Sequence, residues 1–402
     1  MIYLDNAATT RPCAEAVAAV NDALTARWGN PSAVHRLGIE AARLLRTARQ
    51  DVAEAMGAET ERVFFTSGGT EADNWAIFSA AERLGKRGRH IVTTAVEHHA
   101  VLHPMQKLER QGFSVTYLQP DAEGRVSIES LQAALRPDTI LVSIMMVNNE
   151  SGAVMPIERM ARLTHRVCPN ALFHTGAVQG FFKVPFRART LGADLISVSA
   201  HKVHGIKGAG ALYIRPGLSL PPFVLGGGQE SGLRSGTEGL PAIAAFAAAC
   251  RAALPKRTES IARQRRLLAQ AQELLRAIDG VQLLGAQEAP HILNLAVPGV
   301  RSQGLINALQ ERDIYVSAGS ACSKGHRSHV LEATSPMAAL ASRPRWPTMD
   351  ESIYCMAIVV ICVRMAGRLS CQTSRSCGAS VFQVCFGMTS SKKPPGRARG
   401  GR

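Results

Sequence analysis

The feature that most constrains the fold is an alternation of short β-rich runs and helical patterns between residues 63 and 215. Strands that alternate with helices predict a mostly parallel α/β sheet. The run 139–147 is apolar apart from Thr139 and Ser143, which is typical of a strand buried on both faces. A helix is expected at 71–84, and the other expected strands are 63–66, 90–94, 171–174, 195–199 and 210–214. Ligands of such sheets bind beyond the carboxyl ends of the strands, and the polar motifs of this sequence fall there.

The pattern changes after Pro255. A long amphipathic helix is expected at 258–278, with Thr258 as its N-cap and Gly280 as its stop. Strands at 281–284, 291–297 and 314–317 and a helix at 302–311 complete a smaller α+β unit. We therefore expect a large domain at 15–255, a small domain made of 1–14 and 256–333, and an aberrant, poorly ordered tail at 334–402.

Composition excludes several classes of protein. The N-terminus has no signal-peptide pattern, and the apolar run 355–363 is too short to span a bilayer, so a soluble cytoplasmic protein is expected. The nine cysteines contain no CxxC pair, which argues against a disulfide framework or a zinc site. The formal charge of +15 is uneven: from residue 334 onward ten Lys/Arg face two acids. We therefore do not expect nucleic acid or a membrane as a partner.

Two motifs indicate a phosphate-bearing cofactor. The run 67–71, SGGTE, lies between a strand and a helix, where Gly69 and Thr70 could present backbone N–H groups and a hydroxyl to an anion. A Gly-rich turn that only caps the helix is the simpler alternative. Lys202 follows the strand 195–199, and a lysine shielded there could form a Schiff base. Ser199 and His201 beside it could donate to a phosphate.

Other polar groups follow neighbouring strands. His98 could stack on a planar cofactor or move protons, although a satisfied loop histidine is the alternative. Asn149 and Gln179 could bind an aromatic hydroxyl. The Gly-rich stretch 226–237, which ends at Thr237, could supply a second phosphate contact.

Cys322 lies in the loop 317–325, SAGSACSKG. Small residues make such a loop accessible, and Lys324 favours a thiolate. Core cysteines seldom lie in Ser/Gly loops, so we interpret Cys322 as reactive. A purely structural role is expected for Cys13, Cys168 and Cys250.

Together these motifs resemble the cysteine desulfurases of the nitrogen-fixation type, within the class V aminotransferase group of fold-type I pyridoxal phosphate (PLP) enzymes. The resemblance runs from Tyr3 to about Glu332 and includes YLDNAATT at 3–10, GNPS at 29–32, SGGTEADN at 67–74, NNE at 148–150, SAHK at 199–202 and SAGSACS at 317–323. It implies a mostly parallel seven-stranded-type sheet flanked by helices, with a smaller α+β domain. It also implies conversion of L-cysteine to L-alanine, with the sulfur supplied to iron–sulfur clusters.

The resemblance also implies a role for each candidate residue. Lys202 would hold PLP and move protons, His98 would stack on its ring and assist proton transfer, and Cys322 would receive the sulfur as a persulfide. Thr237 would reach the phosphate of a neighbouring subunit, which implies a homodimer. An iron–sulfur scaffold protein would accept the sulfur, and no metal site is expected beyond a cluster contact at Cys322. The phosphate would bind Gly69, Thr70, Ser199 and His201, and the ring hydroxyl Asn149 and Gln179.

The sequence departs from the family's pattern in two places. Family members carry Asp where this chain has Gly176, and that carboxylate pairs with the pyridinium nitrogen. On this reading, Gly176→Asp is expected to raise turnover. After Glu332 the family motif with the substrate-binding arginine is absent, so Arg343, Arg345 and Arg364 receive no role. A catalytically impaired PLP-fold protein and a selenocysteine lyase are therefore the alternatives, and nitrogenase-specific and general cluster assembly both remain open.

Overall fold

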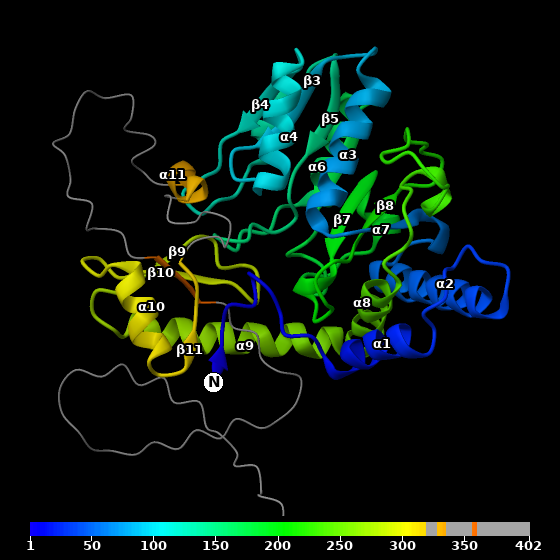
Figure 1. Cartoon of the computed structure of the whole chain (residues 1–402). Coiled ribbons are helices and arrows are strands. Elements are labelled where there is room, and N and C mark those ends of the chain that lie inside the picture. Colours follow the sequence, from blue (N-terminus) through cyan, green and yellow to red (C-terminus); the bar gives the residue numbers. More distant parts are fainter. Residues whose placement is uncertain (319–327, 335–355, 360–402) are drawn as a thin grey trace, which may run out of the picture. The chain divides into compact units, whose positions relative to one another are not determined.

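A computed structural model describes residues 1–318, 328–334 and 356–359 (Figure 1). Met1–Cys362 form one compact unit. Its main element is a seven-stranded sheet in which β8 is antiparallel to both of its neighbours and the other strands are parallel. The predicted α/β fold is therefore confirmed. The strand order is β2 (Val63–Thr66), β8 (Gly210–Ile214), β7 (Leu195–Ser199), β6 (Leu172–Gly176), β5 (Thr139–Ser143), β3 (His90–Thr94) and β4 (Ser114–Leu118).

Both faces of this sheet are buried, because successive side chains of a strand point to opposite faces. In β2, Val63 and Phe65 belong to one apolar core and Phe64 to the other. Helices α3 (Gly69–Leu84) and α4 (His99–Arg110) cover the face of Phe64. The opposite face is covered by α2 (Arg36–Met56), α5 (Ile128–Ala134), α6 (Ile157–Val167), α7 (Ala188–Leu191) and α8 (Leu240–Ala253), with α1 (Ala14–Thr25) packed on α8.

The remaining elements form two smaller sheets. Strands β9 (Gln282–Leu284), β10 (Leu293–Ala296) and β12 (Met356–Val359) pair antiparallel, and β1 (Ile2–Tyr3) pairs parallel with β11 (Ile314–Tyr315). Helices α9 (Arg257–Arg276), α10 (Ser302–Gln310) and α11 (His329–Thr334) belong to this part of the chain. The pairing of β1 with β11 supports the grouping of 1–14 with 256–333, but the domain boundaries stay a prediction.

Several details differ from the sequence-based expectations. Strand β4 at Ser114–Leu118 was not expected, and several strand bounds, such as those of β6, β10 and β11, are shifted. Strand β12 lies in the tail, where no packed element was expected, and its backbone pairs with one edge of β10. Strand β5 ends at Ser143 rather than at residue 147, because the next backbone groups bond outside the β3 ladder: Met145 N–H donates to a Glu97 carboxylate oxygen. Helix α9 begins at Arg257, and Thr258 is not its N-cap, because the short 3₁₀ turn Leu254–Lys256 leads directly into it. Among the described residues, no helix is both long and apolar enough to cross a membrane.

Candidate active site

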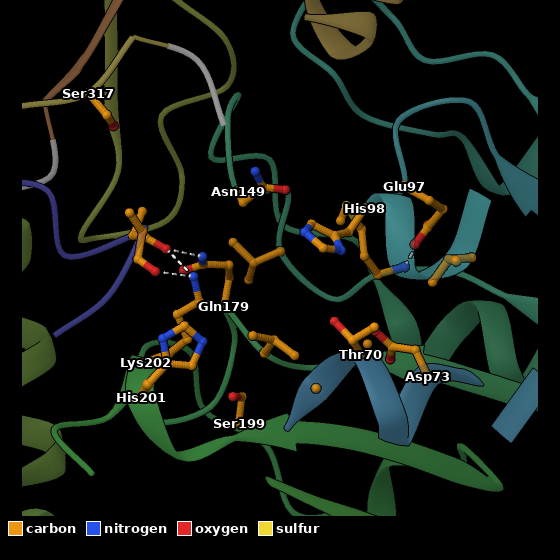
Figure 2. A pocket seen from close by; sticks show the side chains of 18 residues that line it. Thr70, Asp73, Glu97, His98, Asn149, Gln179, Ser199, His201, Lys202 and Ser317 are labelled. Atoms are coloured by element: carbon orange, nitrogen blue, oxygen red, sulfur yellow. Dashed lines mark hydrogen bonds between the residues drawn. The ribbon is translucent and has the colours of Figure 1, made fainter. Parts of the chain in front are cut away.

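A cavity of about 250 Å³ opens at the carboxyl edge of the parallel strands (Figure 2). The segments that follow β2, β3, β5, β6 and β7 all reach it, as expected for an α/β sheet. The cavity brings together nearly all the residues predicted to bind the cofactor: Gly69, Thr70, His98, Asn149, Gln179, Ser199, His201 and Lys202.

Two predicted residues are not part of this lining. Thr237 is exposed and does not line the cavity. Its predicted role toward a neighbouring subunit therefore stays a prediction. Cys322 lies outside the described residues. No arginine in the described part of the chain lines the cavity.

Lys202 lies at the end of a short 3₁₀ turn, Ala200–Lys202, directly after β7. Its Nζ donates to the main-chain oxygens of Ala7, at 2.5 Å, and Ala8, at 2.8 Å. The Gln179 amide nitrogen donates to the same Ala7 oxygen at 2.9 Å (Figure 2). The N-terminal segment therefore holds the Lys202 Nζ atom in the cavity through two main-chain carbonyl groups.

The N-terminus of α3, where the sequence predicts a phosphate cradle, lines the cavity at Gly69 and Thr70. A Cβ at Gly69 would lie 2.8 Å from Val178 Cγ2, so any larger residue here would crowd the Val178 side chain. The Glu71 carboxylate accepts from the Ser67 N–H at 2.8 Å and from Arg234 Nε at 2.6 Å. Burial opposes the charge of Glu71, but these hydrogen bonds lower its pKa below the ordinary value. The Glu71–Arg234 pair thereby connects the start of α3 to the Gly-rich stretch 226–237.

Two histidines of the cavity are held neutral. Burial, together with the charge of Lys202, lowers the pKa of His201 to about 4. Burial also lowers the pKa of His98 below its ordinary value. Because His98 Nδ1 accepts from the Ala100 N–H at 3.1 Å, the neutral ring carries its proton on Nε2. His98 therefore serves as a fixed hydrogen-bond donor in the resting site.

Two buried acids of the cavity were missed by the sequence reasoning. Asp73, on α3, is 4% exposed, and Glu97, after β3, is 1% exposed. Burial raises the pKa of Glu97 to about 8, and the charge of Asp73 adds to this rise. The sequence contained one indication of Asp73: it lies one helical turn after Gly69, so both residues share one face of α3.

The described residues on either side of the segment 319–327 are held beside the cavity. Ser317 lines it and donates to Asp5 Oδ1 at 2.7 Å. On the other side, the Ser328 hydroxyl binds the Glu150 carboxylate, and His329 Nε2 donates to the Glu97 carbonyl at 2.9 Å. In the sequence, Cys322 follows Ser317 by five residues and precedes Ser328 by six.

A metal centre has no support in the described residues, since no group of three or more His, Cys, Asp or Glu there could hold an ion. Burial raises the pKa of the thiols of Cys13, Cys168 and Cys250, which fits their expected structural role.

The chain is similar to known proteins over most of its length. Residues 2–341 match the family described as aminotransferase class-V. A NifS/IcsS protein homolog of Lactobacillus delbrueckii subsp. bulgaricus is 42% identical over 88% of this chain and 93% of its own. The putative cysteine desulfurase IscS 1 of Bacillus subtilis is 42% identical over 83% of this chain and 88% of its own. A solved NifS-like protein superposes with a TM-score of 0.81 at 36% identity, covering 90% of this chain and 93% of that one.

Proposed function

We infer that this chain, which belongs to the aminotransferase class-V family, is a PLP-dependent cysteine desulfurase that takes up sulfur from L-cysteine on Cys322. The observation that carries this proposal is the position of Lys202, whose Nζ is held in a cavity that the start of α3 also lines. Iron–sulfur cluster assembly is the destination of the sulfur in this class of enzyme.

The residues of the cavity fit PLP. We propose that backbone N–H groups at the start of α3 bind the phosphate, assisted by the helix dipole, at Gly69, where a Cβ would lie 2.8 Å from Val178 Cγ2. We propose that Thr70, Ser199 and His201 complete this phosphate site. We propose that Asn149 and Gln179 contact the ring hydroxyl, for which the Gln179 amide would share its present bonds to Ala7 and His291. When bound, PLP supplies an electron sink for the substrate carbon atoms.

The chain's own groups hold and move the protons. Lys202 Nζ would exchange its bonds to the Ala7 and Ala8 carbonyls for the cofactor, and it would then be placed to carry a proton between substrate carbons. His98 presents its Nε2–H to the cavity and keeps one orientation, because its Nδ1 caps α4. The low pKa of His201 keeps its ring neutral, so it can donate a hydrogen bond to a phosphate without adding a positive charge to the site.

Sulfur transfer to Cys322 balances without an added oxidant. Overall, the Cβ–S bond of L-cysteine breaks and an S–S bond forms to the Cys322 sulfur. The two thiol protons of the reactants are balanced by one additional C–H bond in alanine and the S–H of the persulfide. The anchoring of Ser317 and His329 beside the cavity supports this role, since the chain between them carries Cys322.

We also propose a homodimer, an iron–sulfur scaffold as sulfur acceptor and a cytoplasmic location. The exposure of Thr237 supports the homodimer, because this side chain is available to a second subunit. A reducing compartment keeps a persulfide-forming cysteine as a free thiol, and this favours the cytoplasmic location.

Alanine release from L-cysteine by the PLP-loaded protein tests this function. We expect one alanine per sulfur removed, and loss of sustained release in Cys322→Ala, which keeps the cofactor because Cys322 is not among the proposed PLP contacts. Alanine formation at the parent rate in Cys322→Ala would reject the sulfur-receiving role. Bound PLP without any alanine would reject desulfuration by this chain.

A further inference from the structure

The end of strand β6 leaves open the space where a side chain at position 176 would stand. A Cβ built on Gly176 would have one neighbour within 4 Å, the Oδ1 atom of Asp73 at 3.6 Å. Position 176 and Asp73 both line the cavity. A carboxylate oxygen from another element, α3, therefore lies beside the place that a carboxylate on residue 176 would occupy.

The Oδ1 atom of Asp73 is buried and has no hydrogen-bond partner among the described residues. His174 Nε2 lies 3.5 Å away, but this ring is engaged elsewhere: Nε2 bonds to the Ser197 hydroxyl at 3.0 Å and Nδ1 to the Ser143 hydroxyl at 2.8 Å. A buried carboxylate oxygen without a donor is unfavourable unless a ligand supplies one. Asp73 is thus placed to accept from a group that enters the cavity.

The other buried acid of the cavity is less suited to pair with a cation. Glu97 Oε1 already accepts from the Thr94 hydroxyl at 2.9 Å and from the Met145 N–H at 2.8 Å. With a pKa of about 8, Glu97 is mostly protonated at neutral pH. The two acids therefore have different environments, although both lie on the same side of the cavity (Figure 2).

We propose that Asp73 supplies the carboxylate that Gly176 cannot, by accepting a hydrogen bond from the protonated ring nitrogen of PLP. The proposal rests on the cofactor assignment made above and assigns a residue that the sequence resemblance gave no role. The bond would be charge-assisted, so it would hold the nitrogen protonated and strengthen the electron sink.

This assignment changes the expectation for Gly176→Asp. A carboxylate introduced at 176 would stand beside Asp73, and two like charges at that distance repel. The gain in turnover expected from the sequence therefore requires that Asp73 be neutralised at the same time. Asp73→Asn combined with Gly176→Asp moves the carboxylate from α3 to β6 and keeps the number of charges.

The test compares two cofactors on the full chain: PLP, and its 1-deaza analogue, in which C–H replaces the ring nitrogen. Dissociation constants are measured by titrating cofactor-free protein. The parent should bind PLP more tightly than the analogue, and Asp73→Asn is expected to reduce this preference by about tenfold, the typical effect of one charge-assisted hydrogen bond. The double variant should restore the preference, and Glu97→Gln should keep it.

Binding of the analogue shows directly that a variant has kept its cavity. An unchanged preference in Asp73→Asn, or a loss that appears in Glu97→Gln instead, would overturn the proposal. This test does not depend on desulfuration. If the parent prefers PLP, Asp73→Asn loses that preference and the parent releases no alanine, the inference about Asp73 stands and the proposed reaction is rejected.

Discussion

Replacement of Glu97 by glutamine should stabilise the cofactor-free protein at neutral pH. The pKa of Glu97 rises from an ordinary value of 4.5 to about 8, so at pH 7 folding must bring a proton onto this group. Each pH unit between 4.5 and 7 lowers the free energy of unfolding by about 1.4 kcal/mol, so the total loss at pH 7 is about 3 kcal/mol. Glutamine avoids this cost, and its amide oxygen can still accept from Thr94 and Met145.

The sign of the pH dependence follows from the raised pKa. Below pH 4.5 the acid is protonated in both states, so parent and variant should be equally stable. Between pH 4.5 and 8 the unfolded parent loses its proton while the folded parent keeps it, so the variant gains an increasing advantage. Above pH 8 the advantage should stay constant.

Urea unfolding of parent and variant at several pH values from 5 to 9 measures this difference. Glu82→Gln is the matched control, because Glu82 is exposed on α3 and its charge stays in water in both states. For the control, the difference from the parent should not change with pH. A Glu97→Gln difference that is equally flat, or a variant less stable than the parent at pH 7.5, would refute the reasoning.

Two further predictions concern the cradle and its support. Gly69→Ala should weaken PLP binding about tenfold in a fluorescence titration, because its Cβ would crowd Val178, whereas Gly68→Ala should weaken it much less, since its Cβ would meet nothing within 4 Å. Equal losses in the two variants would contradict this account. Arg49→Met should lower the free energy of unfolding by about 3 to 5 kcal/mol, since it leaves the buried Glu230 carboxylate without its bidentate partner. Adding Glu230→Gln should recover most of that loss, and no recovery would mean that the packing of Arg49 matters more than its charge.

Much of the large sheet could be predicted from the sequence, because its strands are short apolar runs bounded by glycines and polar residues. Strands at 63–66, 90–94, 195–199 and 210–214 have the predicted bounds. The run 139–147 was read as one strand because hydrophobicity reports burial and not pairing. Residues 144–147 are buried beside the cavity, and there the Met145 N–H donates to the Glu97 carboxylate and not to a strand.

The residues that line the site could be predicted wherever a motif followed a strand, as for Lys202 and His98. Their partners could not, because these come from distant parts of the chain. The carbonyl of Ala7 lies 195 residues from Lys202 in sequence, and no local pattern marks a main-chain oxygen as a ligand. Asp73 escaped notice for a related reason: an acid within a helix is usually solvated, and the packing of α3 on the sheet, which buries Asp73, involves distant parts of the chain.

The pairing of β1 with β11 has a consequence for the order in which the protein can fold during its synthesis. Asp5 and Ser317, which are hydrogen bonded, are 312 residues apart in sequence, and the partners of β1 emerge from the ribosome only after the whole large sheet. Until then Ala7 and Ala8 lack the anchor that β11 gives to their segment, although Lys202 is already synthesised. Because contacts of such long sequence separation form slowly, the lysine-holding segment should be among the last parts of the site to assemble. A nascent chain stalled before β11 should therefore bind PLP poorly even when its seven-stranded sheet is complete.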